Sequence, residues 1–146
     1  MGFLKNKRVE NEINAKNILK IINDCKRIVN STKNPDIYFE RYSLLEEKAR
    51  ELCTIKHIHF TGTQPKKIVK IVAGSKQASI RAMIDRYFDD ISIKARRLKT
   101  KKAKREKIYS FITTLEDYYG YMNEENVQYI QTLYNNAMQY FDLDEK

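Results

Sequence analysis

The stretch KQASIRAMIDRYFDDISIKARRL, Lys76 to Leu98, decides the fold because its apolar residues recur every three or four positions. The residues in this series are Ile80, Ile84, Tyr87, Ile91, Ala95 and Leu98. Their spacing places one apolar stripe along one side of a helix. The stretch therefore predicts a central amphipathic helix.

The same period predicts further helices on both sides of this stretch. A first helix covers about 11–29, with a stripe of Ala15, Ile18, Ile22, Cys25 and Val29. Asn34 and Pro35 then give an N-cap and a first-turn proline for a second helix that runs to about Ile55. A short third helix is expected over 65–72. It should end at Gly74, with Ser75 capping the central helix.

Two more helices are expected after the central one. The fifth ends near Gly120, and Asn123 caps the sixth. Together these patterns predict an all-α fold, a single-domain bundle of about six helices with a C-terminal antiparallel helical hairpin. Residues 1–10 are expected to form a flexible basic N-terminus, and residues 11–146 a single helical domain.

Composition excludes several classes of protein. The chain has 146 residues, of which 42% are hydrophobic and 32% charged, so it has the size and balance of one globular domain and not of a disordered chain. Neither a signal-peptide core nor a membrane span is expected, and Asn6 stands where an N-myristoylation signal needs Ser or Thr. Cys25 and Cys53 both fall in apolar helical patterns, which predicts buried thiols and a cytoplasmic protein.

A basic run lies between residues 94 and 107, where nine Lys and Arg residues accompany a single acid, Glu106. The run carries a net charge of +8, while residues 108–146 carry −6. Such a density is typical of a surface that binds nucleic acid or another polyanion, because neutralised phosphates release counterions. The candidate contact residues are Lys99, Lys101, Lys102, Lys104, Arg105 and Lys107.

The basic run also has a structural explanation. Its residues up to Lys99 lie at the C-terminal end of the central helix, where they complement the negative end of the helix dipole. Those from Lys101 onward begin the next helix, where cations are disfavoured. An antiparallel hairpin would place Asp142, Asp144 and Glu145 beside them as counter-charges. The run also lacks the interleaved aromatic rings of a single-strand platform, and it does not read as a helix-turn-helix.

Two other segments were considered as binding sites. Cys53, His57 and His59 form a C-x3-H-x-H cluster, but zinc ligands usually come in tighter pairs, so no metal is expected. The segment TGTQPKK, 61–67, enters a helix and could hold an anion. It lacks the second glycine and the Lys-Ser/Thr pair of a P-loop, and Thr63 with Pro65 is explained by helix capping.

No catalytic constellation can be recognised by spacing. Asp85, Asp89 and Asp90 resemble a carboxylate cluster, but Arg86 with Asp90 and Asp90 with Lys94 are i,i+4 pairs of a solvated helix face. No Ser-His-Asp or Cys-His arrangement is present. We therefore expect neither enzymatic activity nor a cofactor.

Four segments together resemble a known group of proteins. They are NPDIYFERY (34–42), FTGTQP (60–65), IDRYFDDISIKARRLKT (84–100) and MNEENVQYIQTLYNNA (122–137). The chain resembles a family of short helical proteins from low-GC Gram-positive bacteria and their mobile elements. The resemblance implies no activity. A glycine often stands in that pattern where this chain has Ala103, which implies a stiffer join between the two helices here.

The sequence thus favours a non-catalytic helical module that acts through protein contacts, including self-association. The amphipathic helices and the ten tyrosines motivate this hypothesis. The alternative is a protein that binds nucleic acid or another polyanion through residues 94–107. No membrane partner is expected.

Overall fold

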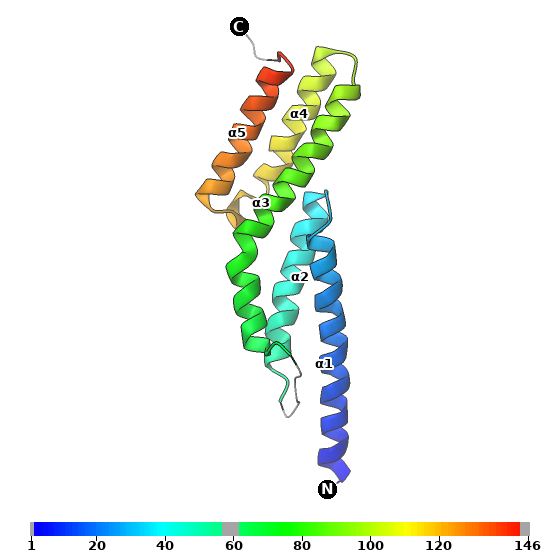
Figure 1. Cartoon of the computed structure of the whole chain (residues 1–146). Coiled ribbons are helices and arrows are strands. Elements are labelled where there is room, and N and C mark those ends of the chain that lie inside the picture. The colour runs from blue at the N-terminus through cyan, green and yellow to red at the C-terminus, as the bar shows by residue number, and fades with distance from the viewer. Residues whose placement is uncertain (1, 57–61, 144–146) are drawn as a thin grey trace. The chain divides into compact units, whose positions relative to one another are not determined.

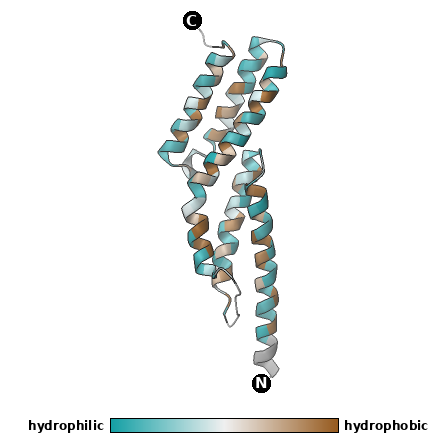
Figure 2. Cartoon of the chain, viewed as in Figure 1, coloured by the Kyte–Doolittle hydropathy of each residue, from teal (hydrophilic) through white to brown (hydrophobic). Residues whose placement is uncertain are grey.

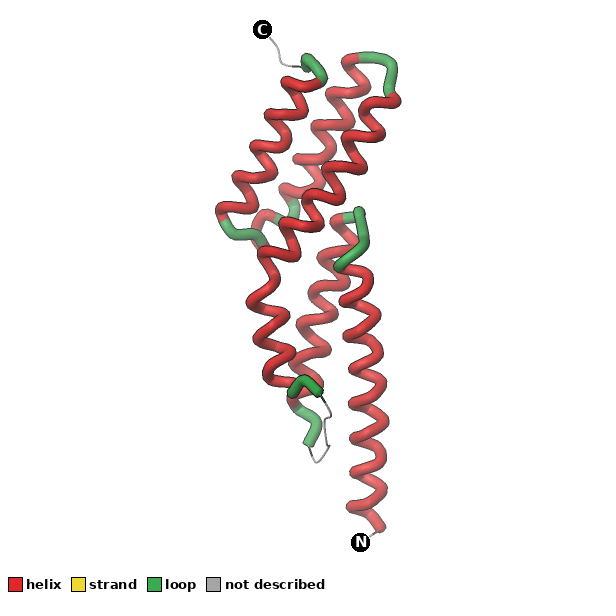
Figure 3. The backbone as a smooth tube through the Cα atoms, viewed as in Figure 1, coloured by secondary structure: helices red, strands yellow, loops and turns green. Residues whose placement is uncertain are grey.

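Helices account for most of the chain. The structure is a computed structural model that describes residues 2–56 and 62–143, with side chains from residue 7 onward. Within those residues it contains five α-helices, one 3-10 turn and no strand (Figure 1 and Figure 3), so the all-α class is confirmed. The elements are α1 (Gly2–Val29), α2 (Pro35–Cys53), α3 (Pro65–Arg97), α4 (Lys101–Glu116), η1 (Tyr119–Tyr121) and α5 (Glu124–Tyr140).

The expected count of about six helices is wrong by one, because α3 is continuous from Pro65 to Arg97. Gly74 does not end a helix, and Ser75 does not cap one. Instead the Ser75 hydroxyl donates to the carbonyl of Ile71 at 2.7 Å, a bond back to the preceding turn. A glycine inside a helix costs only about 1 kcal/mol relative to alanine, which the packing of a long amphipathic helix can override.

The predicted caps of α2 and α5 are confirmed. The Asn34 side-chain oxygen accepts from the backbone N–H groups of Asp36 and Ile37 at 2.9 and 3.2 Å, and Asn123 accepts from Asn126 in the same way. Thr100 caps α4 by accepting from the N–H of the residue three positions later. Helix α1 begins at Gly2 and so includes most of the segment expected as a flexible N-terminus.

Contacts divide the chain into two compact units. Unit 1 consists of Met1–Ser31 and Phe39–Lys76, and unit 2 of Thr32–Tyr38 and Gln77–Lys146, so the boundaries fall within α2 and α3. Each unit buries apolar residues of its own. The expectation of one domain over residues 11–146 stays a prediction that unfolding experiments can test.

Unit 1 packs α1, most of α2 and the first part of α3. All five residues of the predicted α1 stripe are buried, with exposures from 1% at Cys25 to 6% at Ile18. They share the core with Tyr42, Leu45, Ala49, Leu52, Ile68 and Val72. Between α2 and α3, the Tyr42 hydroxyl donates to the Val72 carbonyl. The period of the sequence therefore identifies the inner face of these helices correctly.

Unit 2 packs the rest of α3 against α4 and α5, with the apolar positions on the inner faces (Figure 2). Its core contains Ile80, Ile84, Tyr87, Ile91 and Ala95 of the predicted stripe, joined by Ile108, Phe111, Ile112, Leu115 and Ile130. The Phe111 ring lies 5.6 Å from the ring centre of Tyr87 and 5.2 Å from that of Phe88. These contacts hold α4 against α3.

The C-terminal hairpin is present. Helices α4 and α5 pack together and are joined by η1. Helix α5 ends in a Schellman motif, in which Asp142 takes a φ of 54° and the N–H of Leu143 donates to the carbonyl of Met138 at 2.8 Å. Leu143 is fully buried, so the end of the hairpin is closed by an apolar side chain.

Candidate functional site

The basic run surrounds the junction between α3 and α4 in unit 2. Helix α3 ends at Arg97 and α4 begins at Lys101, so the run covers the last turn of one helix, a three-residue link and the first turns of the next. This junction lies at the same end of the α4–α5 hairpin as the C-terminus of α5, because Lys101 contacts Asp142. The six predicted contact residues divide into three groups here.

Lys104 and Arg105 serve the fold. The Lys104 ammonium donates to the carbonyl of Ala95 at 2.9 Å and to that of Arg96 at 3.4 Å, both in the last turn of α3, where the Ala95 carbonyl also accepts from the N–H of Leu98 at 3.1 Å. It also lies 5.5 Å from the ring centre of Phe141. The Arg105 guanidinium donates to the carbonyl of Leu143 at 2.9 Å, and its Nε is buried. Both cations are thus directed to backbone carbonyls inside the unit.

Lys101 has a partial counter-charge. Its ammonium lies 3.0 Å from the Asp142 carboxylate, as the predicted hairpin requires, but the two side chains are 66% and 80% exposed. An exposed pair of this kind contributes little to stability and leaves both groups accessible. Asp144 and Glu145, the other two expected counter-charges, lie outside the described residues.

The remaining basic side chains stand on the surface. Lys99 and Lys102 are exposed, Lys107 is half-buried, and Arg97 at the end of α3 is exposed as well. Among the residues that the structure describes, none of these four has an ion pair or a side-chain hydrogen bond. The cationic surface of the junction is therefore formed by Arg97, Lys99 and Lys102, only part of the run that the sequence singled out.

An apolar groove lies beside this junction, between α3 and α5. It has a volume of about 170 Å³ and is lined by Phe88, Ser92, Arg96, Asn136, Ala137, Tyr140 and Phe141. Almost all of the surface in the groove is apolar. Two small residues, Ser92 and Ala137, line the hollow together with the larger Phe88, Tyr140 and Phe141, which leaves space between these side chains.

The rim of the groove carries the most exposed apolar side chain of the described chain. Tyr140 is 71% exposed, and its ring packs edge-on against Phe141 with 4.9 Å between ring centres. The Arg96 guanidinium lies 5.8 Å from the centre of the Tyr140 ring. A large aromatic and an arginine are thus presented side by side, next to the cations of the junction.

Sequence reasoning missed this groove. The basic run itself contains no aromatic residue, and Tyr140 lies more than thirty residues later in the sequence, on α5. Only the antiparallel packing of α5 brings it to Arg96. A signal was present all the same, because the apolar residues of this segment recur at Val127, Ile130, Tyr134, Ala137 and Phe141, and Tyr140 lies beside that series. A large aromatic on the polar side of a helix is the kind of residue that interfaces use.

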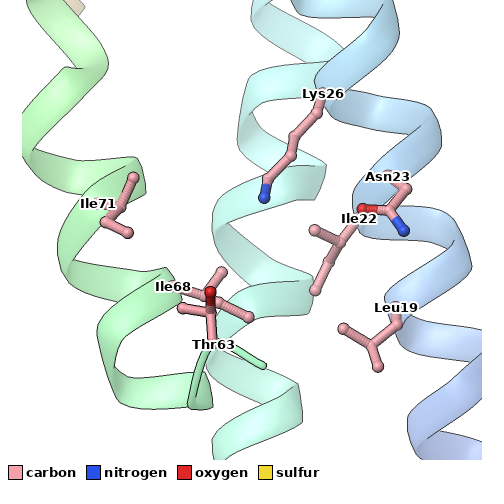
Figure 4. A pocket seen from close by; sticks show the side chains of 7 residues that line it. All are labelled: Leu19, Ile22, Asn23, Lys26, Thr63, Ile68 and Ile71. Atoms are coloured by element: carbon pink, nitrogen blue, oxygen red, sulfur yellow. The ribbon is translucent and has the colours of Figure 1, made fainter. Parts of the chain in front are cut away.

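Unit 1 has a second groove, between α1 and α3 (Figure 4). Its volume is about 220 Å³, and Leu19, Ile22, Asn23, Lys26, Thr63, Ile68 and Ile71 line it. The isoleucines and the leucine point into the hollow, whereas the Lys26 ammonium extends across its upper end. This groove is more polar than the one in unit 2, and no exposed aromatic side chain lines it.

The C-x3-H-x-H cluster of Cys53, His57 and His59 lies only partly within the described residues. Cys53 is exposed, which corrects the expectation of a buried thiol. It is the last residue of α2 and comes directly after the buried Leu52. Neighbouring positions of a helix point in different directions, so Cys53 lies beside the buried stripe and not on it. His57 and His59 lie outside the described residues. Cys25 is buried as expected, and burial raises the pKa of its thiol. Among the described residues, no three potential metal ligands gather.

Two of the three carboxylates of α3, those of Asp85 and Asp90, have partners within the fold. Asp90 forms the predicted ion pair with Lys94 at 2.9 Å. Asp85 accepts a hydrogen bond from the Tyr129 hydroxyl of α5, which raises the pKa of that tyrosine. Asp89 is exposed. Asp90 thus stabilises the surface of α3, and Asp85 contributes to the contact between α3 and α5.

A buried polar cluster joins α3 to the start of α5. Asn126 is 3% exposed, and its amide donates to the backbone carbonyl and the side chain of Gln77 at 2.9 and 3.0 Å. Its side-chain oxygen accepts from Arg81 at 2.9 Å, and Arg81 in turn stacks 3.8 Å from the ring centre of Tyr129. All the polar groups of the Asn126 amide are satisfied, so the cluster fixes how the two helices pack.

Comparison with known proteins gives no match to any family, curated protein or solved structure. None of the helices in the described chain combines the length and the apolar character that a bilayer-crossing segment needs. The function therefore has to be argued from the geometry of the junction and the groove.

Proposed function

We propose that the protein is a non-catalytic helical module that binds another protein through the α3–α5 groove of unit 2. The observation that carries this proposal is the pairing of a preformed apolar hollow with an aromatic side chain, Tyr140, that is 71% exposed. Tyrosine and arginine are the residue types most enriched at interface hot spots, and Arg96 adjoins Tyr140.

The size of the groove supports a protein partner over a small ligand. Sites for small molecules usually have volumes of about 300–1,000 Å³, well above that of this groove. An engineered cavity of about 150 Å³ takes up one benzene molecule, so a hollow of 170 Å³ has room for a single large side chain. A partner that inserts one anchoring residue and spreads over the surrounding helices fits this size.

A retention experiment tests the proposal with a matched pair of variants. Full-length protein, Tyr140→Ala and Tyr109→Ala are immobilised, and the proteins retained from a cell extract at physiological salt are quantified by mass spectrometry. Tyr109 is 55% exposed on α4 and lies outside the groove, so it controls for general loss of an exposed tyrosine. We expect at least one protein to be retained by the wild type and Tyr109→Ala but not by Tyr140→Ala. Identical retention by all three would refute the proposal.

Self-association through the groove is a variant of the same function. Light scattering after size exclusion measures the mass of the wild type and of Tyr140→Ala. A dimer that only Tyr140→Ala abolishes would identify a second copy of the chain as the partner. A monomer in both cases would leave a different protein as the partner.

A second candidate is binding of a polyanion at the junction, favoured by the exposed Arg97, Lys99 and Lys102. In this case affinity for single-stranded and duplex oligonucleotides falls steeply with salt, because each phosphate contact releases a counterion. Charge reversal at these three positions would abolish it. Lys104 and Arg105 are unsuitable for this test because they hold the ends of α3 and α5. The absence of a gel shift at low salt would reject this candidate.

A further inference from the structure

We infer that the α3–α5 groove takes an acidic segment of its partner that inserts one aromatic or leucine side chain. This inference rests on the proposed function and adds the chemistry of the partner. It follows from three features of the described residues: the apolar lining of the groove, its volume, and the positive charge at the end that adjoins the junction between α3 and α4.

The lining selects an apolar anchor. Ser92 and Ala137 are 9% and 4% exposed and form the floor, while Phe88, Tyr140 and Phe141 supply apolar walls. Almost all of the surface in this hollow is apolar, so a nucleobase would find few partners for the polar edges of its ring, which costs free energy. A phenyl or leucine side chain has no such groups. The volume of 170 Å³ matches one side chain of this size.

The charge around the groove selects acidic flanks. Arg96 lines the groove at the end of α3, and the exposed Arg97, Lys99 and Lys102 follow it at the junction. The latter three have no ion-pair partner within the described chain, so they meet an incoming carboxylate without first losing an internal bond. Asp90 and Asp142 are already paired with lysines, and Glu106, the one acid of the run, forms no ion pair with these cations among the described residues. An acidic segment is therefore attracted to this end and a basic one repelled.

The carbonyl-bound cations give the surface its shape. Lys104 holds carbonyls in the last turn of α3 and Arg105 holds the carbonyl of Leu143, so the junction is fixed where Arg97 and Lys99 follow the groove residue Arg96 along the chain. The partner meets a positive surface that is already in place. Little ordering of the module is needed on binding, which favours affinity.

The experiment uses a library of random 12-residue peptides displayed on phage and selected against the full-length protein. A parallel selection uses Ser92→Phe, in which the new ring fills the hollow, and circular dichroism checks that this variant is folded. Tyr140→Ala provides a second groove variant, because removing so exposed a side chain leaves the core intact. Tyr109→Ala is the matched control.

The composition of the selected peptides decides the inference. We expect peptides recovered by the wild type and Tyr109→Ala, but lost by both groove variants, to be rich in Asp and Glu around one Phe, Tyr, Trp or Leu. Replacing that anchor by alanine should weaken binding of a single synthetic peptide at least tenfold, since burial of such a side chain contributes about 1.5–3 kcal/mol. Arg96→Glu should weaken it as well.

Two further outcomes are distinguishable. Groove-dependent peptides that are neutral or basic would overturn the inferred partner chemistry while leaving the proposed function standing. Peptides that bind the groove variants as well as the wild type would overturn the inference together with the use of the groove as a binding site.

Discussion

Replacement of Lys104 by methionine tests whether the basic run is divided between structure and surface. The substitution keeps most of the aliphatic stem and removes the ammonium that donates to Ala95 at 2.9 Å and to Arg96 at 3.4 Å. Hydrogen bonds to charged groups contribute about 1.5–3 kcal/mol, and the half-exposed position of Lys104 places it at the lower end of this range. We therefore expect Lys104→Met to lower the free energy of unfolding by about 1.5–2 kcal/mol.

Lys102→Met is the matched control and should act in the opposite direction. Lys102 is the second residue of α4, is exposed, and places a positive charge at the positive end of the helix dipole. Its removal should stabilise the protein by about 0.3–0.5 kcal/mol, the lower part of the range for such charges.

Urea titrations followed by circular dichroism and tyrosine fluorescence measure both variants. A change in the midpoint at constant slope gives the change in stability. The difference between the two variants, about 2 kcal/mol, corresponds to roughly 4–8 °C in Tm for a chain of this length. If both variants unfold at the same urea concentration, Lys104 does not hold the end of α3 and the division of the run proposed above is wrong.

Three more predictions concern the fold. Gly74→Ala should stabilise the protein by about 0.5–1 kcal/mol in thermal unfolding, since Gly74 is inside α3 and a Cβ there meets open space; destabilisation would mean that the helix ends there, as its sequence pattern predicts. Asn126→Ala should cost about 2–4 kcal/mol in urea unfolding because it leaves several buried polar groups unpaired, whereas the exposed Asn135→Ala should change stability by less than about 0.5 kcal/mol. The hydrogen bond from the Tyr118 hydroxyl to Asp36 raises the pKa of that tyrosine to about 12. The bond therefore stabilises the fold fully below pH 10 and is lost as the pH rises towards 12. A difference ultraviolet titration of wild type and Tyr118→Phe should show one tyrosine ionising near pH 12, and a difference centred at pH 10 would contradict the assignment.

The sequence by itself determined the class of fold and the inner face of most helices. A stripe of apolar residues every three or four positions requires burial on one side whatever the neighbours are, so Ile22, Leu45 and Ile84 could be placed in the core from their spacing alone. The caps at Asn34 and Asn123 were equally local, because each side chain bonds backbone groups two or three residues away.

Local signals failed where a longer-range interaction competed with them. Gly74 and Ser75 carry the signs of a helix end, yet the continuous stripe on both sides keeps α3 in one piece. Cys53 lies in the last turn of α2 directly after the buried Leu52 and is exposed, so it belongs to the outer side of the helix. Burial depends on the neighbours that a helix meets, which its own period does not specify.

Tertiary structure alone decided the candidate site. The sequence showed that the basic run needs a counter-charge, but the groups that hold Lys104 and Arg105 are backbone carbonyls of other segments, which any residue could provide. The groove depends on the register of α5 against α3, which brings Ser92 and Ala137 to one hollow and Tyr140 beside Arg96. That register results from the packing of the whole hairpin, and no pattern within one helix encodes it.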